Sequence, residues 1–170
     1  MITKPEQWLG NPAVEEILSV SECLSKSLLD HTSLWLHNAW FLYDSLEVLQ
    51  RALDRTGTAA SASVRRFCYE VHEDLLDDAW IPLSGTPPGA ARPSPGFVLR
   101  GYDVVCLMSG ADGPQCSPLS CNSEARRFDV NKYCLLASLE QAIEVAQRID
   151  LDGACEPGPY GIMSVWEASS

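Results

Sequence analysis

The sequence predicts an α+β fold, with a small mostly antiparallel or mixed sheet and three to four helices packed on it. Three observations support this prediction. Stretches with apolar residues at helical spacing alternate with short runs of branched and aromatic residues, which are typical of strands. Two segments, at 38–47 and 131–140, have a strand-like run that leads directly into a Ser-capped helix. The length of 170 residues suits one hydrophobic core, so we expect a single domain spanning 1–170.

The N-terminal part of the chain predicts a helix followed by strand structure. Asn11 is a favoured helix N-cap, and Pro12 suits the first helical position because its missing amide hydrogen would be unpaired there. Apolar residues then recur at three- and four-residue spacing, so the helix should extend over 12–29. Residues 31–43 are rich in aromatic and branched side chains and should form two short strands or one bent strand.

Two more helices are expected before the middle of the chain. Ser45 can cap a helix that ends at Gly57, since glycine readily adopts the left-handed conformation that ends helices. A further apolar stripe predicts a helix over 61–80. The outer face of this helix would carry five carboxylates, at Glu70, Glu73, Asp74, Asp77 and Asp78. Carboxylates near a helix C-terminus oppose the helix dipole by about 0.3–1 kcal/mol each, so this face is our candidate binding surface.

The second half of the chain begins with a loop and continues with strands and one helix. Residues 84–96 hold four prolines and three glycines, and we expect an exposed loop within the domain. The later elements are a strand at 97–108 with a bulge at Gly101, a loop at 109–123, a strand at 131–137, a helix at 138–149 and a strand at 160–166. Ser138 and Gln141 should form a reciprocal capping box at the start of the helix.

The two strand-to-helix segments are similar in sequence. NAWFLYDSLE at 38–47 and NKYCLLASLE at 131–140 share Asn, Leu, Ser, Leu and Glu at matching positions. A duplication would produce this match, and so would the shared requirements of any strand that leads into a Ser-capped helix. We favour the second explanation, because a single matching offset is weak support for duplication.

The charge of the chain excludes some classes of function. Twelve basic residues against 23 acidic ones give a formal net charge of −11, which repels nucleic-acid phosphates and anionic lipids and favours a basic partner or simply solubility. The first twelve residues do not resemble a signal peptide, and no apolar stretch is long enough to span a membrane. Seven cysteines, an odd number, fit reduced thiols, so we expect a cytoplasmic location.

Four cysteines in the second half could in principle hold a metal. Cys116, Cys121, Cys134 and Cys155 supply enough thiolates for a tetrahedral zinc site. Structural zinc sites usually contain two closely spaced pairs, whereas only Cys116 and Cys121 lie close together here. We therefore expect no metal, and favour a structured loop over either zinc or a Cys116–Cys121 disulfide.

The sequence contains no established catalytic motif. Neither GxGxxG, GxxxxGK[ST], GxSxG nor HExxH occurs, and no cofactor is expected. Cys68 and His72 would meet on a helix as a nucleophile and its base, but a buried cysteine beside a boundary histidine is the favoured interpretation. His31 and His37, with Asp30 and Asp44 nearby, could perform acid–base chemistry, although hydrogen bonds within a turn are the favoured role.

These observations favour binding over catalysis. We expect a cytoplasmic protein that resembles immunity or inhibitor proteins in its action and binds a basic protein partner through Glu70, Glu73, Asp74, Asp77 and Asp78. One alternative is an enzyme whose Cys and His residues are brought together by the fold. Another is a structural protein stabilised by a metal bound to the loop cysteines.

Overall fold

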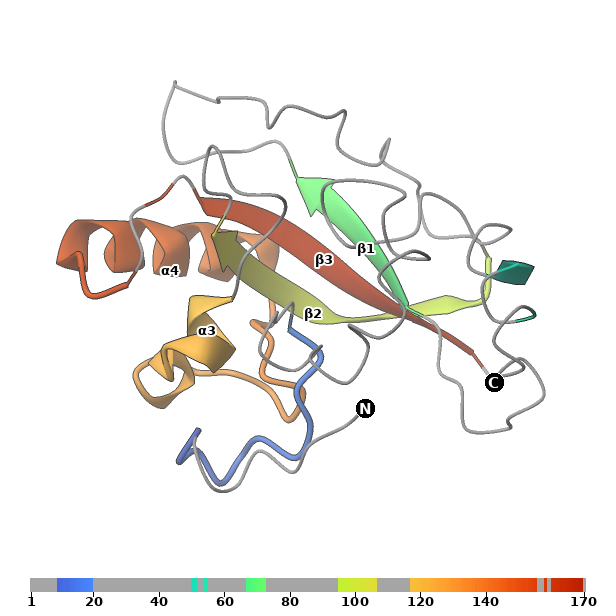
Figure 1. Cartoon of the computed structure of the whole chain (residues 1–170), viewed down its shortest axis with the longest axis horizontal. Coiled ribbons are helices and arrows are strands. Elements are labelled where there is room, and N and C mark those ends of the chain that lie inside the picture. Colours follow the sequence, from blue (N-terminus) through green and yellow to red (C-terminus); the bar gives the residue numbers. More distant parts are fainter. Residues whose placement is uncertain are drawn as a thin grey trace.

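The computed structural model describes most of the C-terminal half of the chain and shorter parts of the N-terminal half. The described residues are 9–19, 50–51, 54, 67–72, 95–106, 117–155, 158 and 160–169. The elements within them are β1 (Phe67–His72), β2 (Phe97–Cys106), α3 (Pro118–Cys121), the 3-10 helix η5 (Glu124–Arg126), α4 (Leu139–Asp152) and β3 (Tyr160–Ala168) (Figure 1). The prediction of three to four helices on the sheet is wrong, because this part of the chain forms two α-helices beside three antiparallel strands.

β3 is the central strand of the sheet and pairs antiparallel with both β1 and β2, in the order β1-β3-β2. All residues from Tyr160 to Val165 are buried. A strand covered on both faces needs apolar or small residues at successive positions, and the sequence YGIMSV provides them. The strands predicted at 97–108 and 160–166 are thus present as β2 and β3, with bounds that differ by at most two residues.

β2 contains the bulge predicted at Gly101. The pairing of β2 with β3 shifts register between Leu99 and Gly101, so Arg100 is the additional residue. Gly101 has φ +148°, a conformation that residues with a Cβ rarely adopt. A Cβ there would lie 2.7 Å from both the Leu135 Cβ and the Leu136 carbonyl oxygen. The absence of a side chain at Gly101 therefore allows Leu135 and Leu136 to approach the strand closely.

α4 packs its apolar stripe onto the sheet and closes the main core. Ala142, Val145, Ala146 and Ile149 are buried on one side of the helix. They join a core cluster that also contains Val104 of β2, Ile162 of β3, Leu119 of α3 and residues of the N-terminal segment.

Both ends of α4 are capped. Ser138 caps the start of the helix through its Oγ, which accepts a hydrogen bond from the Gln141 amide at 3.1 Å, and Gly153 ends it with φ +59°. The helix predicted at 138–149 is therefore present, and it begins one residue later and ends three residues later.

The described part of the helix predicted at 12–29 is not helical. The Asn11 side chain accepts a hydrogen bond from the Ala13 amide and forms a local turn. The amides of Glu15 and Glu16 then donate to the Lys132 carbonyl oxygen, and that of Leu18 donates to Tyr133. These amides are satisfied by another part of the chain instead of by carbonyls one turn earlier. Residues 9–19 form an irregular segment that lies along the loop before α4 (Figure 1).

The helix predicted at 61–80 is wrong at residues 67–72, which form β1. Phe67, Tyr69 and Val71 stand at alternate positions, and each is a residue type favoured in strands. The apolar residues of this segment fit both a helical and a strand period, so local pattern does not distinguish them. Pairing with β3 decides the outcome, because β3 supplies hydrogen-bond partners along the whole segment.

The strand predicted at 131–137 is also wrong. The Asn131 Oδ1 accepts hydrogen bonds from the amides of Tyr133 and Leu135, at 2.9 and 3.2 Å. Cys134 takes a positive φ of 60°, which reverses the chain direction. The segment is therefore a tight turn, and only Leu136 forms a bridge, with Tyr102 of β2. The loop predicted at 109–123 contains α3 from Pro118 onward, and the described residues of that region begin at Ser117.

Several predictions lie wholly or mostly outside the described residues. These are the strands at 31–43, most of the helix from Ser45 to Gly57, and residues 84–94 of the Pro/Gly-rich loop. Gln50, Arg51 and Asp54 are helical, and Pro95 and Gly96 form an exposed turn. Among the helices of the described chain, none has both the length and the apolar character needed to span a bilayer.

Candidate functional site

The predicted acidic surface is only partly within the described structure. Glu70 lies in the middle of β1, paired in register with Ser164 of β3. The helical spacing that grouped it with the later carboxylates therefore does not apply at this position. The other four residues lie outside the described part of the chain, at Glu73, Asp74, Asp77 and Asp78.

The Cys68–His72 pair, which we considered as the less favoured interpretation, does not form. Both residues belong to β1, where Cys68 pairs in register with Trp166 and His72 with Ile162. Four residues of extended strand separate their Cα atoms by roughly 13 Å. A helix would have brought the two residues to within one turn of each other, and the strand removes this proximity. His31 and His37 lie outside the described residues.

The loop cysteines are described at three positions of the four. Cys134 is fully buried, Cys121 and Cys155 are half-buried, and Cys116 lies outside the described residues. The described part of the chain contains no group of three or more His, Cys, Asp and Glu side chains placed to hold a metal ion. Because Cys116 lies outside the described residues, the choice between a structured loop, which we favour, and a Cys116–Cys121 disulfide is not tested.

A buried polar cluster connects β2 to the start of α3. Asp103 of β2 and Ser117 are both 0% exposed, and the Ser117 Oγ donates a hydrogen bond to the Asp103 Oδ1 at 2.5 Å. Ser120, also buried, donates from its Oγ to the Ser117 carbonyl oxygen at 3.4 Å. Sequence reasoning missed this cluster. The available signal was an aspartate within an otherwise apolar strand, followed by a serine-rich loop.

The thiol of Cys134 lies close to this cluster and is held in its neutral form. Burial is the main cause, because it disfavours the charged thiolate, and the negative charge of Asp103 adds to the effect. Together they raise the pKa of Cys134 to about 12 from an ordinary value of 9.0. A protonated thiol is a poor nucleophile and a poor metal ligand. The cluster therefore has the properties of a structural element, not of a catalytic site.

We predict that alkylation of Cys134 in the folded protein will be very slow at pH 8. The thiolate fraction there is roughly a thousandfold lower for a pKa near 12 than for one near 9. The rate should rise with pH up to about 12, and should increase sharply in denaturant. Mass spectrometry after timed iodoacetamide treatment will measure it. Rapid labelling of Cys134 in the folded state at pH 8 would contradict this prediction.

We also predict that Ser117→Ala destabilises the protein by about 1.5–3 kcal/mol, because it removes a hydrogen bond to a buried carboxylate. Ser120→Ala is a matched control, since it also removes a buried hydroxyl close to the start of α3. The hydrogen bond of this hydroxyl is longer and has a neutral acceptor. Its expected effect is about 1 kcal/mol or less. Urea unfolding followed by circular dichroism will compare the two, and equal losses would show that the carboxylate contact has no special weight.

The N-terminal segment is attached to the η5 region by one side chain from each. The Arg126 Nε donates to the Leu9 carbonyl oxygen at 2.5 Å, and the Asn11 Nδ2 donates to the Ala125 carbonyl oxygen at 2.7 Å. Gly10, with φ +61°, allows this approach, because a Cβ there would lie 2.6 Å from the Arg126 Nη2. Leu9 itself is fully buried. These contacts hold the segment against the core.

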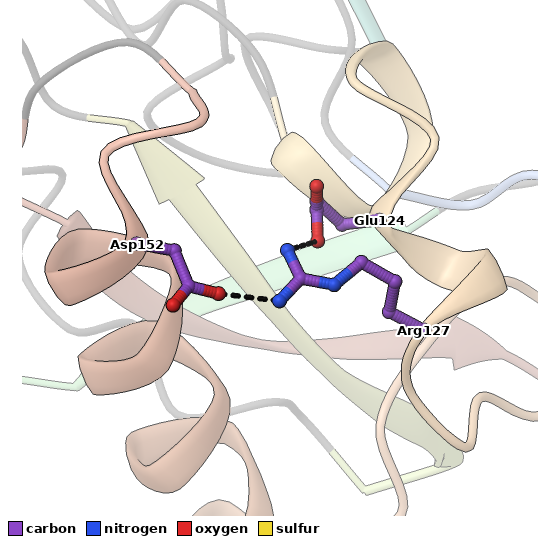
Figure 2. A network of polar contacts seen from close by, with 3 residues as sticks. All are labelled: Glu124, Arg127 and Asp152. Carbon is purple, nitrogen blue, oxygen red and sulfur yellow. Dashed lines mark hydrogen bonds and ion pairs between the residues drawn. The ribbon is translucent and has the colours of Figure 1, made fainter.

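Arg127 connects the η5 region to the C-terminal end of α4. Figure 2 shows its guanidinium between two carboxylates, with Nη1 2.8 Å from the Glu124 Oε2 and Nη2 paired with the Asp152 Oδ2. The hydrogen bond that Arg127 donates to Asp152 and the negative charge of Glu124 raise the pKa of Arg127. Arg127 and Arg148 each lie 5.5 Å from the centre of the Phe128 ring. This network joins two elements and leaves no excess charge of either sign.

The outward side of α4 carries an exposed stripe, which we call the α4 outer stripe. Its members follow one another at four-, three- and four-residue spacing, and all are exposed: Glu140, Glu144, Gln147 and Leu151. The pKa of Glu140 is lowered by a hydrogen bond from its own backbone amide and by one from Ser138, so its carboxyl group is charged at neutral pH. Leu151 is 85% exposed. The stripe was not singled out from the sequence, which showed it only as the polar side of an amphipathic helix.

Comparisons with known proteins do not add a family to this description. No protein-family model matches the sequence, and neither a curated protein nor a solved structure shows significant similarity to the chain.

Proposed function

We propose that this protein acts by binding a basic protein partner, in the manner of an immunity or inhibitor protein. The observation that carries the proposal is the formal net charge of −11. A surface with such an excess of carboxylates attracts cationic proteins and accelerates their association. A cytoplasmic location remains part of the proposal.

Ion pairs within the chain do not remove the excess of negative charge. Three described cations are paired within the chain: Arg100 with Glu167, Arg127 with Glu124 and Asp152, and Lys132 with Glu15. The pairing of Lys132 raises its pKa, mainly through the hydrogen bond with Glu15. Because each pair neutralises carboxylates together with its cation, the excess of negative charge on the whole chain stays unchanged.

The α4 outer stripe offers one place for the contact. Glu140 and Glu144 are exposed one helical turn apart and repel each other, and a cation from a partner would relieve this repulsion. Arg148 follows Glu144 by four residues, but its guanidinium lies over the Phe128 ring. The predicted carboxylates Glu73, Asp74, Asp77 and Asp78 are the second candidate surface.

The enzyme and metal alternatives receive no such support from the described residues. Cys134 is held protonated, and Cys68 and His72 are separated along β1. Neither arrangement could activate a nucleophile as it stands.

The proposal predicts salt-sensitive capture of a basic protein. The immobilised full-length protein should retain such a partner from a lysate at low ionic strength and release it at high ionic strength, because salt screens exposed charges. The measurement is mass spectrometry of the eluate, followed by association rates of the purified pair at several salt concentrations. A chain that captures no salt-sensitive partner would overturn the proposal.

Charge-removing variants then identify the surface. The double variant Glu140→Gln and Glu144→Gln should slow association at low salt by roughly twofold or more while changing dissociation little, if α4 makes the contact. Gln147→Ala is the matched control, because it alters the same stripe without changing its charge. An equivalent set of Gln and Asn substitutions at Glu73, Asp74, Asp77 and Asp78 tests the other surface. Unchanged rates for both sets would exclude both surfaces.

A further inference from the structure

We draw no further inference here: the strongest candidate, the exposed Leu151 at the C-terminal end of the α4 outer stripe, is a single apolar side chain on the acidic surface already proposed, and nothing in the described part of the chain shows what covers it.

Discussion

Replacing Gly101 with alanine is expected to lower the free energy of unfolding by about 3 kcal/mol or more. Two costs combine at this position. The new Cβ would lie 2.7 Å from the Leu135 Cβ and from the Leu136 carbonyl oxygen, and φ of +148° is strained for alanine. The backbone oxygen cannot move without breaking the bridge between Leu136 and Tyr102. Equilibrium urea unfolding, monitored by tryptophan fluorescence, will measure the loss.

Gly96→Ala is the control for this substitution. Gly96 also has a positive φ, of +99°, and lies in the turn before β2, but a Cβ there would meet no atom within 4 Å. The control therefore includes backbone strain without the steric clash. We expect a loss of roughly 1–3 kcal/mol at Gly96, smaller than at Gly101. Equal losses at the two glycines would mean that the close approach of the turn to β2 is not as tight as described.

Asn131→Ala is expected to destabilise the protein by about 2–4 kcal/mol, because three hydrogen bonds of its side chain are lost together. The Oδ1 accepts from the amides of Tyr133 and Leu135, and the Nδ2 donates to the Arg100 carbonyl oxygen at 2.8 Å. The last bond attaches the turn to the bulge of β2. The free energy of unfolding from urea titration is again the measurement.

Asn131→Asp separates the two roles of this side chain. The aspartate keeps the acceptor oxygen for the two amides but cannot donate to the Arg100 carbonyl oxygen, which it would face with a second oxygen. We expect an intermediate loss, smaller than that of the alanine variant. An aspartate variant as unstable as Asn131→Ala would show that attachment to β2, and not the internal turn, provides most of the stabilisation.

The elements that the sequence predicted well are those with signals inside the element itself. α4 has an N-cap at Ser138, a glycine just after its end and an apolar stripe along its length. β2 and β3 are runs of branched and aromatic residues, and Gly101 indicated the bulge. In each case a residue acts on backbone groups a few positions away, so the local sequence contains the needed information.

The candidate sites also differ in how much of each could be predicted from the sequence. The charge of −11, on which the proposed partner depends, could be taken from composition alone. The proximity of Asp103, Ser117 and Cys134 could not, because they come from a strand, a helix start and a turn that are separated in sequence. The less favoured Cys68–His72 pair is wrong for a related reason, since it assumed a helix in which the two residues would meet.

The sequence by itself determined the capped helix α4, the strands β2 and β3 and the acidic character of the surface. The tertiary structure decided the conformation of three segments whose apolar spacing is compatible with more than one secondary structure: residues 12–19, 67–72 and 131–137. Backbone amides of residues 67–72 find partners in β3, and those of the N-terminal segment find them at Lys132 and Tyr133. The amides of Tyr133 and Leu135 instead donate to the Asn131 side chain within the turn. A buried backbone amide must be paired. At residues 12–19 and 67–72 local preference did not decide the conformation, so the acceptors supplied by other segments determined it.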